Sequence, residues 1–186
     1  MTLTAPMEAR SDRPTPRPTG PDAEAWAAKL RVANINPRTG LATDYLNHFN
    51  EAIMLLEMVP DMPECAEDFL TWTPLSYAEH FIASNFKARD LAIEAYETAD
   101  TRVRAEFDNI ANTMTSILTA VGAAMREVRQ DKTRVALAQQ AIVWVKPLAR
   151  SPAASSTAAG RPKSMTSWRA IRHNTATIRP CRADRS

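Results

Sequence analysis

The stretch TRVRAEFDNIANTMTSILTAVGAAMREVRQDKTRVALAQQAIVWVK, residues 101–146, carries the strongest periodic signal in the chain. Apolar side chains recur in it at alternating spacings of four and three: Val103, Phe107, Ile110, Met114, Ile117, Val121, Ala124 and Val128. The same phase continues through Asp131 to Val135, Ala138, Ile142 and Val145. A strict heptad repeat of this kind predicts a helix suited to pairing with a second helix.

This stretch permits more than one arrangement. Proline is absent between Thr101 and Lys146, and the only glycine is Gly122, so a single helix of about 65 Å is one possibility. Asp131 is the polar interruption of the stripe, and two collinear pieces that meet there are a second possibility. Folding the last piece back at Asp131 would instead make it the fourth helix of a closed bundle.

Shorter helices are predicted before this stretch. Residues 43–58 carry a stripe of apolar side chains at helical spacing, which consists of Leu46, Phe49, Ile53 and Leu56. Ser76 and Glu79 have the spacing of a capping box, which predicts a helix over 76–98. A further short helix is expected over 22–32. The expected fold is therefore all-α, a small helical bundle or helical hairpin with one long heptad-patterned helix and disordered N- and C-terminal tails.

The two ends differ from the middle in composition. Residues 1–21 contain five prolines among small and charged residues, which predicts a disordered Pro-rich leader. From Pro147 onward there are eight basic residues and one acidic residue, which give a net charge of +7. Because the whole chain carries +2, residues 1–146 carry a net charge of −5. We expect a helical domain over 22–146 and a disordered basic tail over 147–186. A frame-shifted reading after Arg150 is a second interpretation of this tail, since it has no apolar periodicity.

Cysteine content and hydropathy bear on location. The chain has two cysteines, Cys65 and Cys181, which cannot form a disulfide framework and favour a reducing compartment. The N-terminal residues have no apolar core of signal-peptide length. No stretch approaches the roughly 18 apolar residues of a membrane span. The expectation is a cytoplasmic protein without a membrane partner.

His48, Glu51 and His80 are weak candidates for a metal site. Asp44, His48 and Glu51 share one face of the helix predicted over 43–58, and His80 lies on the next helix. The paired Glu-x-x-His motifs of di-iron bundles are missing, however. The simpler interpretation is that these are ordinary neighbours on a helix surface, so neither a metal nor another cofactor is expected.

The string WTPLSYAEH, residues 72–80, resembles the Trp-Ser…Glu-His segment of DinB-like metal-binding four-helix bundles. The resemblance implies a helical bundle that binds a metal or a small ligand, with His80 at the matching position. It covers these residues alone. The later paired histidines of that family have no counterpart, because the remaining histidine, His173, lies in the predicted tail.

Motifs for other chemistries are missing. The chain has no Gly-x-Ser-x-Gly and no Gly-rich phosphate loop, and it shows no catalytic motif that would predict an enzyme. Association with nucleic acid would rest on the basic tail alone, in which Trp168 is the one aromatic residue.

The heptad stripe favours a helical protein-interaction or regulatory module. The part of the 101–146 helix beyond the shorter helices would leave apolar side chains uncovered, which soluble monomers generally avoid. The expected interaction residues are Val128, Val135, Ile142 and Val145. The expected partner is a second copy of the chain, forming a dimer, or another helical protein.

Overall fold

The computed structural model describes residues 20–150, and within that range all regular secondary structure is helical. The chain follows the order α1 (Pro21–Val32), α2 (Tyr45–Met58), α3 (Cys65–Thr71), α4 (Tyr77–Ala83), α5 (Arg89–Glu97), α6 (Thr101–Glu127) and α7 (Asp131–Ala149). The all-α prediction is therefore confirmed for this part of the chain. The leader predicted over 1–21 and the basic tail lie, apart from their innermost residues, outside the described residues.

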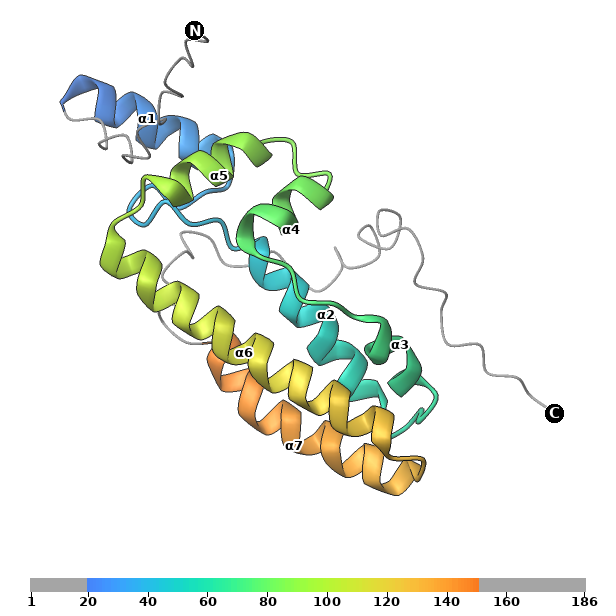
Figure 1. The fold of residues 1–186 in the computed structure, drawn as a ribbon. Helices are drawn as coiled ribbons and strands as arrows, with labels where there is room; N and C mark the ends of the chain where they lie inside the picture. The colour runs from blue at the N-terminus through green and yellow to red at the C-terminus, as the bar shows by residue number, and fades with distance from the viewer. Residues whose placement is uncertain (1–19, 151–186) are drawn as a thin grey trace, which may run out of the picture.

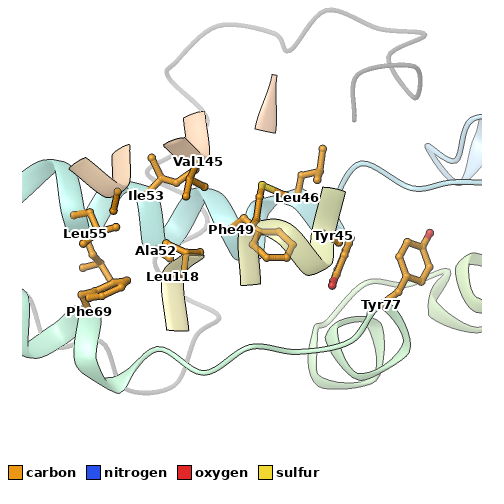
Figure 2. Close-up of a cluster of buried hydrophobic side chains, with 14 of the residues drawn as sticks. Tyr45, Leu46, Phe49, Ala52, Ile53, Leu55, Phe69, Tyr77, Leu118 and Val145 are labelled. Carbon is orange, nitrogen blue, oxygen red and sulfur yellow. The ribbon is translucent and has the colours of Figure 1, made fainter. Parts of the chain in front are cut away.

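A bundle of α2, α3, α6 and α7 forms one half of the molecule, and α1, α4 and α5 gather where α6 begins (Figure 1). Side chains from all four bundle helices meet in one core. Phe49 of α2, Phe69 of α3, Leu118 of α6 and Val145 of α7 are each at most 2% exposed. Figure 2 shows Val145 beside Ile53, on the face of α2 opposite to Phe69.

The chain reverses direction between α6 and α7, so residues 101–146 do not form one helix. Val128 and Gln130 have extended backbone conformations, and α7 returns antiparallel along α6 (Figure 1). Neither glycine nor proline marks this reversal. The Arg134 side chain holds it instead, because its Nε donates to the carbonyl oxygen of Val128 at 2.9 Å. Of the arrangements that the sequence permits, the folded-back fourth helix is the one observed.

The buried stripe of α6 differs from the heptad stripe of the sequence. The buried positions are Phe107, Ala111, Met114, Leu118, Val121, Gly122 and Met125, so Phe107, Met114 and Val121 of the predicted stripe are among them. The heptad positions Ile110, Ile117 and Ala124 are only partly buried. The core-facing row of α6 passes through Ala111, Leu118 and Met125 rather than through Ile110, Ile117 and Ala124, each of which lies one residue earlier. Half of the predicted stripe therefore lies at the edge of the core.

Two predicted helix boundaries are wrong. The helix expected over 76–98 is divided into α4 and α5, because residues 84–88 are not helical. The expected end at Pro147 is passed, since α7 continues to Ala149. A proline in the last turn costs the helix one hydrogen bond and leaves little helix beyond it to disrupt.

The predicted capping box is confirmed. Glu79 N–H donates to Ser76 Oγ at 3.3 Å and Ser76 N–H donates to Glu79 Oε2 at 2.8 Å, which completes the capping box of α4. The residues 36–40 form a turn that ends at Gly40, whose φ is +77°. A Cβ at Gly40 would lie 2.6 Å from the carbonyl oxygen of Ala95, so only glycine fits there.

Candidate functional site

His48 and the connector between α3 and α4 form the centre of a polar and aromatic cluster. The backbone N–H of Leu75 donates to Nε2 of His48 at 3.2 Å. Trp72 stacks on the imidazole with ring centroids 4.8 Å apart, and its Nε1 donates to the His48 carbonyl oxygen at 3.1 Å. His48 thus binds the connector through its side chain and its backbone.

His80 of α4 lies next to this group. Its ring centroid is 6.0 Å from that of His48 and 5.7 Å from that of Tyr45. The hydroxyl of Tyr45 donates to the carbonyl oxygen of Leu75 at 2.9 Å, so two side chains of α2 hold the same residue of the connector.

Burial keeps both imidazoles neutral at physiological pH. Desolvation and, to a smaller extent, the charge of a protonated His80 lower the pKa of His48 to about 4, against the opposing effect of a backbone hydrogen bond with Thr73. Desolvation also lowers the pKa of His80, although the nearby Asp44 carboxylate opposes that shift. Burial raises the pKa of Tyr45 to about 12. The two imidazoles are therefore uncharged polar groups, and Asp44 supplies a carboxylate beside them.

The predicted metal candidates are only partly brought together. His48 and His80 are neighbours, and burial raises the pKa of Glu51 on the next turn of α2. Within residues 20–150, no three His, Cys, Asp or Glu side chains are close enough to hold a metal ion. The Nε2 of His48 is also already an acceptor for Leu75 N–H. This geometry suits a histidine that anchors the connector.

A second candidate site lies on the outer face of the hairpin formed by α6 and α7. An open hollow of about 400 Å³ is lined by Ser116, Ile117, Ala120, Val121, Ala124, Leu137 and Trp144. We call these seven residues the hairpin groove. Trp144 is 53% exposed, and its neighbour Val143 is 64% exposed. A half-exposed tryptophan above small apolar residues is typical of a contact surface for another protein.

The hairpin that bears this groove has long uncharged segments. In α6 no charged residue occurs from Asn109 to Met125, and in α7 none occurs from Val135 to Val145. The solvent-facing sides of helices in monomeric proteins usually carry charged residues. Depletion of charge together with an exposed aromatic residue distinguishes the core of protein interfaces from other surface.

The four predicted interaction residues do not lie on an overhang. Val145 is completely buried, and Val135 and Ile142 are partly buried against the same core. Val128 lies in the reversal between the two helices. The expectation that the α7 side chains are left bare was wrong, because the fold-back of α7 packs Val135, Ile142 and Val145 against the core of the same chain. Ser116, Ala120 and Trp144, which sequence reasoning missed, are the exposed members of the hairpin groove.

Comparison with known proteins gives no relative. The chain matches no family model, no curated protein and no solved structure. Among residues 20–150, no helix combines the length and the hydropathy required to cross a membrane.

Proposed function

We propose that this protein is a cytoplasmic helical interaction module that forms a dimer with a second copy through the hairpin groove. The observation that carries the proposal is the apolar, uncharged groove beside a tryptophan that is 53% exposed. Its proposed role is to hold two chains together, along with any molecule bound to each chain, rather than to catalyse a reaction.

The uncharged surface of the groove is compatible with a second copy as the occupant. Residues 20–150 contain eighteen acidic and thirteen basic residues, a net charge of −5, so net charge alone does not draw two copies of this part of the chain together. The hairpin groove is a region where two copies can touch without placing like charges together. A partner that is recognised by opposite charge would use a charged patch instead.

The groove combines one large side chain with several small ones. Trp144 projects from α7, while the small side chains of Ser116, Ala120 and Ala124 leave room on α6. In a two-fold dimer the same patch meets itself, so the tryptophan of each copy can enter the small-residue side of the other. The half-buried heptad row through Ile117 and Ala124 has the 3.5-residue period that helix pairing across such an interface favours.

Sedimentation equilibrium of the full chain tests the proposal. At tens of micromolar we expect a dimer, and Ala120→Arg should weaken the association by about tenfold or more, because a guanidinium would enter the apolar groove. The matched control is Ala105→Arg, an exposed alanine near the start of α6 and away from the groove. Helicity should be unchanged in both variants.

Two results would contradict the proposal. A wild-type chain that sediments as a monomer at these concentrations would exclude a functional dimer. A dimer that Ala120→Arg leaves intact would place the interface on another face.

A further inference from the structure

A second, smaller cavity lies on the other side of α6, where α6 meets the end of α3 and the connector. Its volume is about 150 Å³, and Phe69, Trp72, Leu118, Thr119, Gly122 and Arg126 are among its lining residues. Phe69 and Leu118 are buried and form an apolar floor, whereas Thr119 and Arg126 are exposed at its mouth. It shares no residue with the hairpin groove.

Arg126 is held at one end of this cavity with unused hydrogen-bond donors. Its Nη2 donates to the carbonyl oxygen of Leu70 at 2.9 Å, which fixes the guanidinium against α3. Among the described residues no carboxylate lies within ion-pair distance of Arg126. A fixed guanidinium with free N–H groups is suited to bind a carboxylate, since its planar fork matches the two oxygens.

Gly122 keeps one wall of the cavity open. Glycine is a poor residue for the middle of a helix, and α6 is otherwise built from better helix formers. Packing within the chain does not require it, because a Cβ there would have its nearest neighbour, Nη1 of Arg126, at 3.7 Å, with Phe69 at 3.8 Å. Alanine would therefore fit without a clash, and what it would remove is space beside the guanidinium.

We propose that this cavity binds a small carboxylate with a flat apolar body, of about the size of benzoate. The body would lie on Phe69 and Leu118, and the carboxylate would accept hydrogen bonds from Arg126. An apolar cavity of about 150 Å³ accommodates a single benzene ring. Drug-sized ligands need pockets of roughly 300–1,000 Å³, so larger molecules are excluded.

The test is a titration of the ¹⁵N-labelled full chain with sodium benzoate, followed at the indole N–H of Trp72. The signal is assigned with Trp72→Phe. We expect saturable shifts, and we expect benzyl alcohol, which has the ring without the charge, to bind at least about tenfold more weakly. Arg126→Gln should lose about tenfold or more in affinity for benzoate and little for benzyl alcohol.

Gly122→Ala provides the independent variant. Its Cβ takes space from the cavity, so benzoate binding should weaken while the melting temperature rises by about 3 °C from the better helix former. The control is Arg102→Gln, an exposed arginine in the first turn of α6, which should leave binding unchanged.

Three outcomes would overturn the proposal: no saturable shift at Trp72 up to tens of millimolar benzoate, equal binding of benzyl alcohol and benzoate, or full affinity in Arg126→Gln. Each can occur whether or not the chain forms a dimer, because the cavity and the hairpin groove share no residues.

Discussion

Arg134 at the start of α7 pairs with Glu67 of α3, with Nη1 of the arginine 2.7 Å from Oε1 of the glutamate. The same arginine donates from Nε to the carbonyl oxygen of Val128 at 2.9 Å. Its side chain is 17% exposed, compared with 66% for that of Glu67. Arg134 therefore stabilises the reversal between α6 and α7 and links this reversal to α3.

Arg134→Ala should lower the free energy of unfolding by about 2 kcal/mol, because it leaves the Val128 carbonyl without its donor and removes the ion pair. Urea denaturation measures this change in the free energy of unfolding. Glu67→Gln should cost less than about 1 kcal/mol, since an exposed pair contributes little. The control is Arg129→Ala, which changes an exposed arginine in the same reversal. An equal loss of stability in that variant would show that the contacts of Arg134 do not stabilise the reversal.

Ser76→Ala should cost about 1 kcal/mol of stability, because it leaves the N–H of Glu79 without an acceptor at the start of α4. Ser76→Thr keeps a hydroxyl and should retain most of the stability. The comparison requires equal denaturant slopes for all three proteins. If alanine and threonine behaved alike, the hydrogen bond would not contribute to stability.

Acidification should destabilise the protein through His48. Its pKa is about 4 in the folded chain and 6.5 without burial, so between these values the unfolded chain binds a proton that the folded chain does not. Stability is then fully present above about pH 7 and falls as the pH drops. The expected loss between pH 7 and pH 5 is about 1–2 kcal/mol.

His48→Gln should flatten this pH dependence, because glutamine does not titrate. Thermal unfolding of both proteins across the same pH range is the measurement. The lowered pKa of His80 contributes in the same direction, so part of the slope should survive. Identical slopes in the variant and the wild type would show that His48 is not the titrating group.

Val145→Ala should cost about 2 kcal/mol, because this side chain is completely buried between α7 and the rest of the core. Val143→Ala is the matched control, since Val143 is two residues away and 64% exposed. Its effect should stay within about 0.5 kcal/mol. Equal effects at the two positions would mean that α7 does not pack as the structure shows it.

The sequence predicted helices more reliably than it predicted their packing. The stripe of Phe49, Ile53 and Leu56 and the capping box at Ser76 are local signals, and both are found in the structure. The reversal at Val128 is stabilised by Arg134 and Glu67, which lie far apart in the sequence. A local sequence pattern therefore does not predict it.

The candidate sites were harder to predict. His48 and His80 were named only as candidates for a metal site with Glu51, and the acceptor role of His48 toward Leu75 depends on the path of the connector. Trp144 was missed because it lies outside the heptad phase. The heptad pattern selected Val145, which is buried in the core, and not its neighbour Trp144, which is exposed.

The packing of α7 against α2 also has a consequence for synthesis of the protein. Val145 of α7 is buried in the core that α2 also lines, and Lys146 forms an ion pair with Glu57 near the end of α2. At about 5–20 residues per second, the ribosome needs roughly 5 to 20 s to proceed from the end of α2 to the end of α7. During that interval the side of α2 around Ile53 lacks the helix that covers it in the finished fold, so this apolar surface is the last part of the core to be buried.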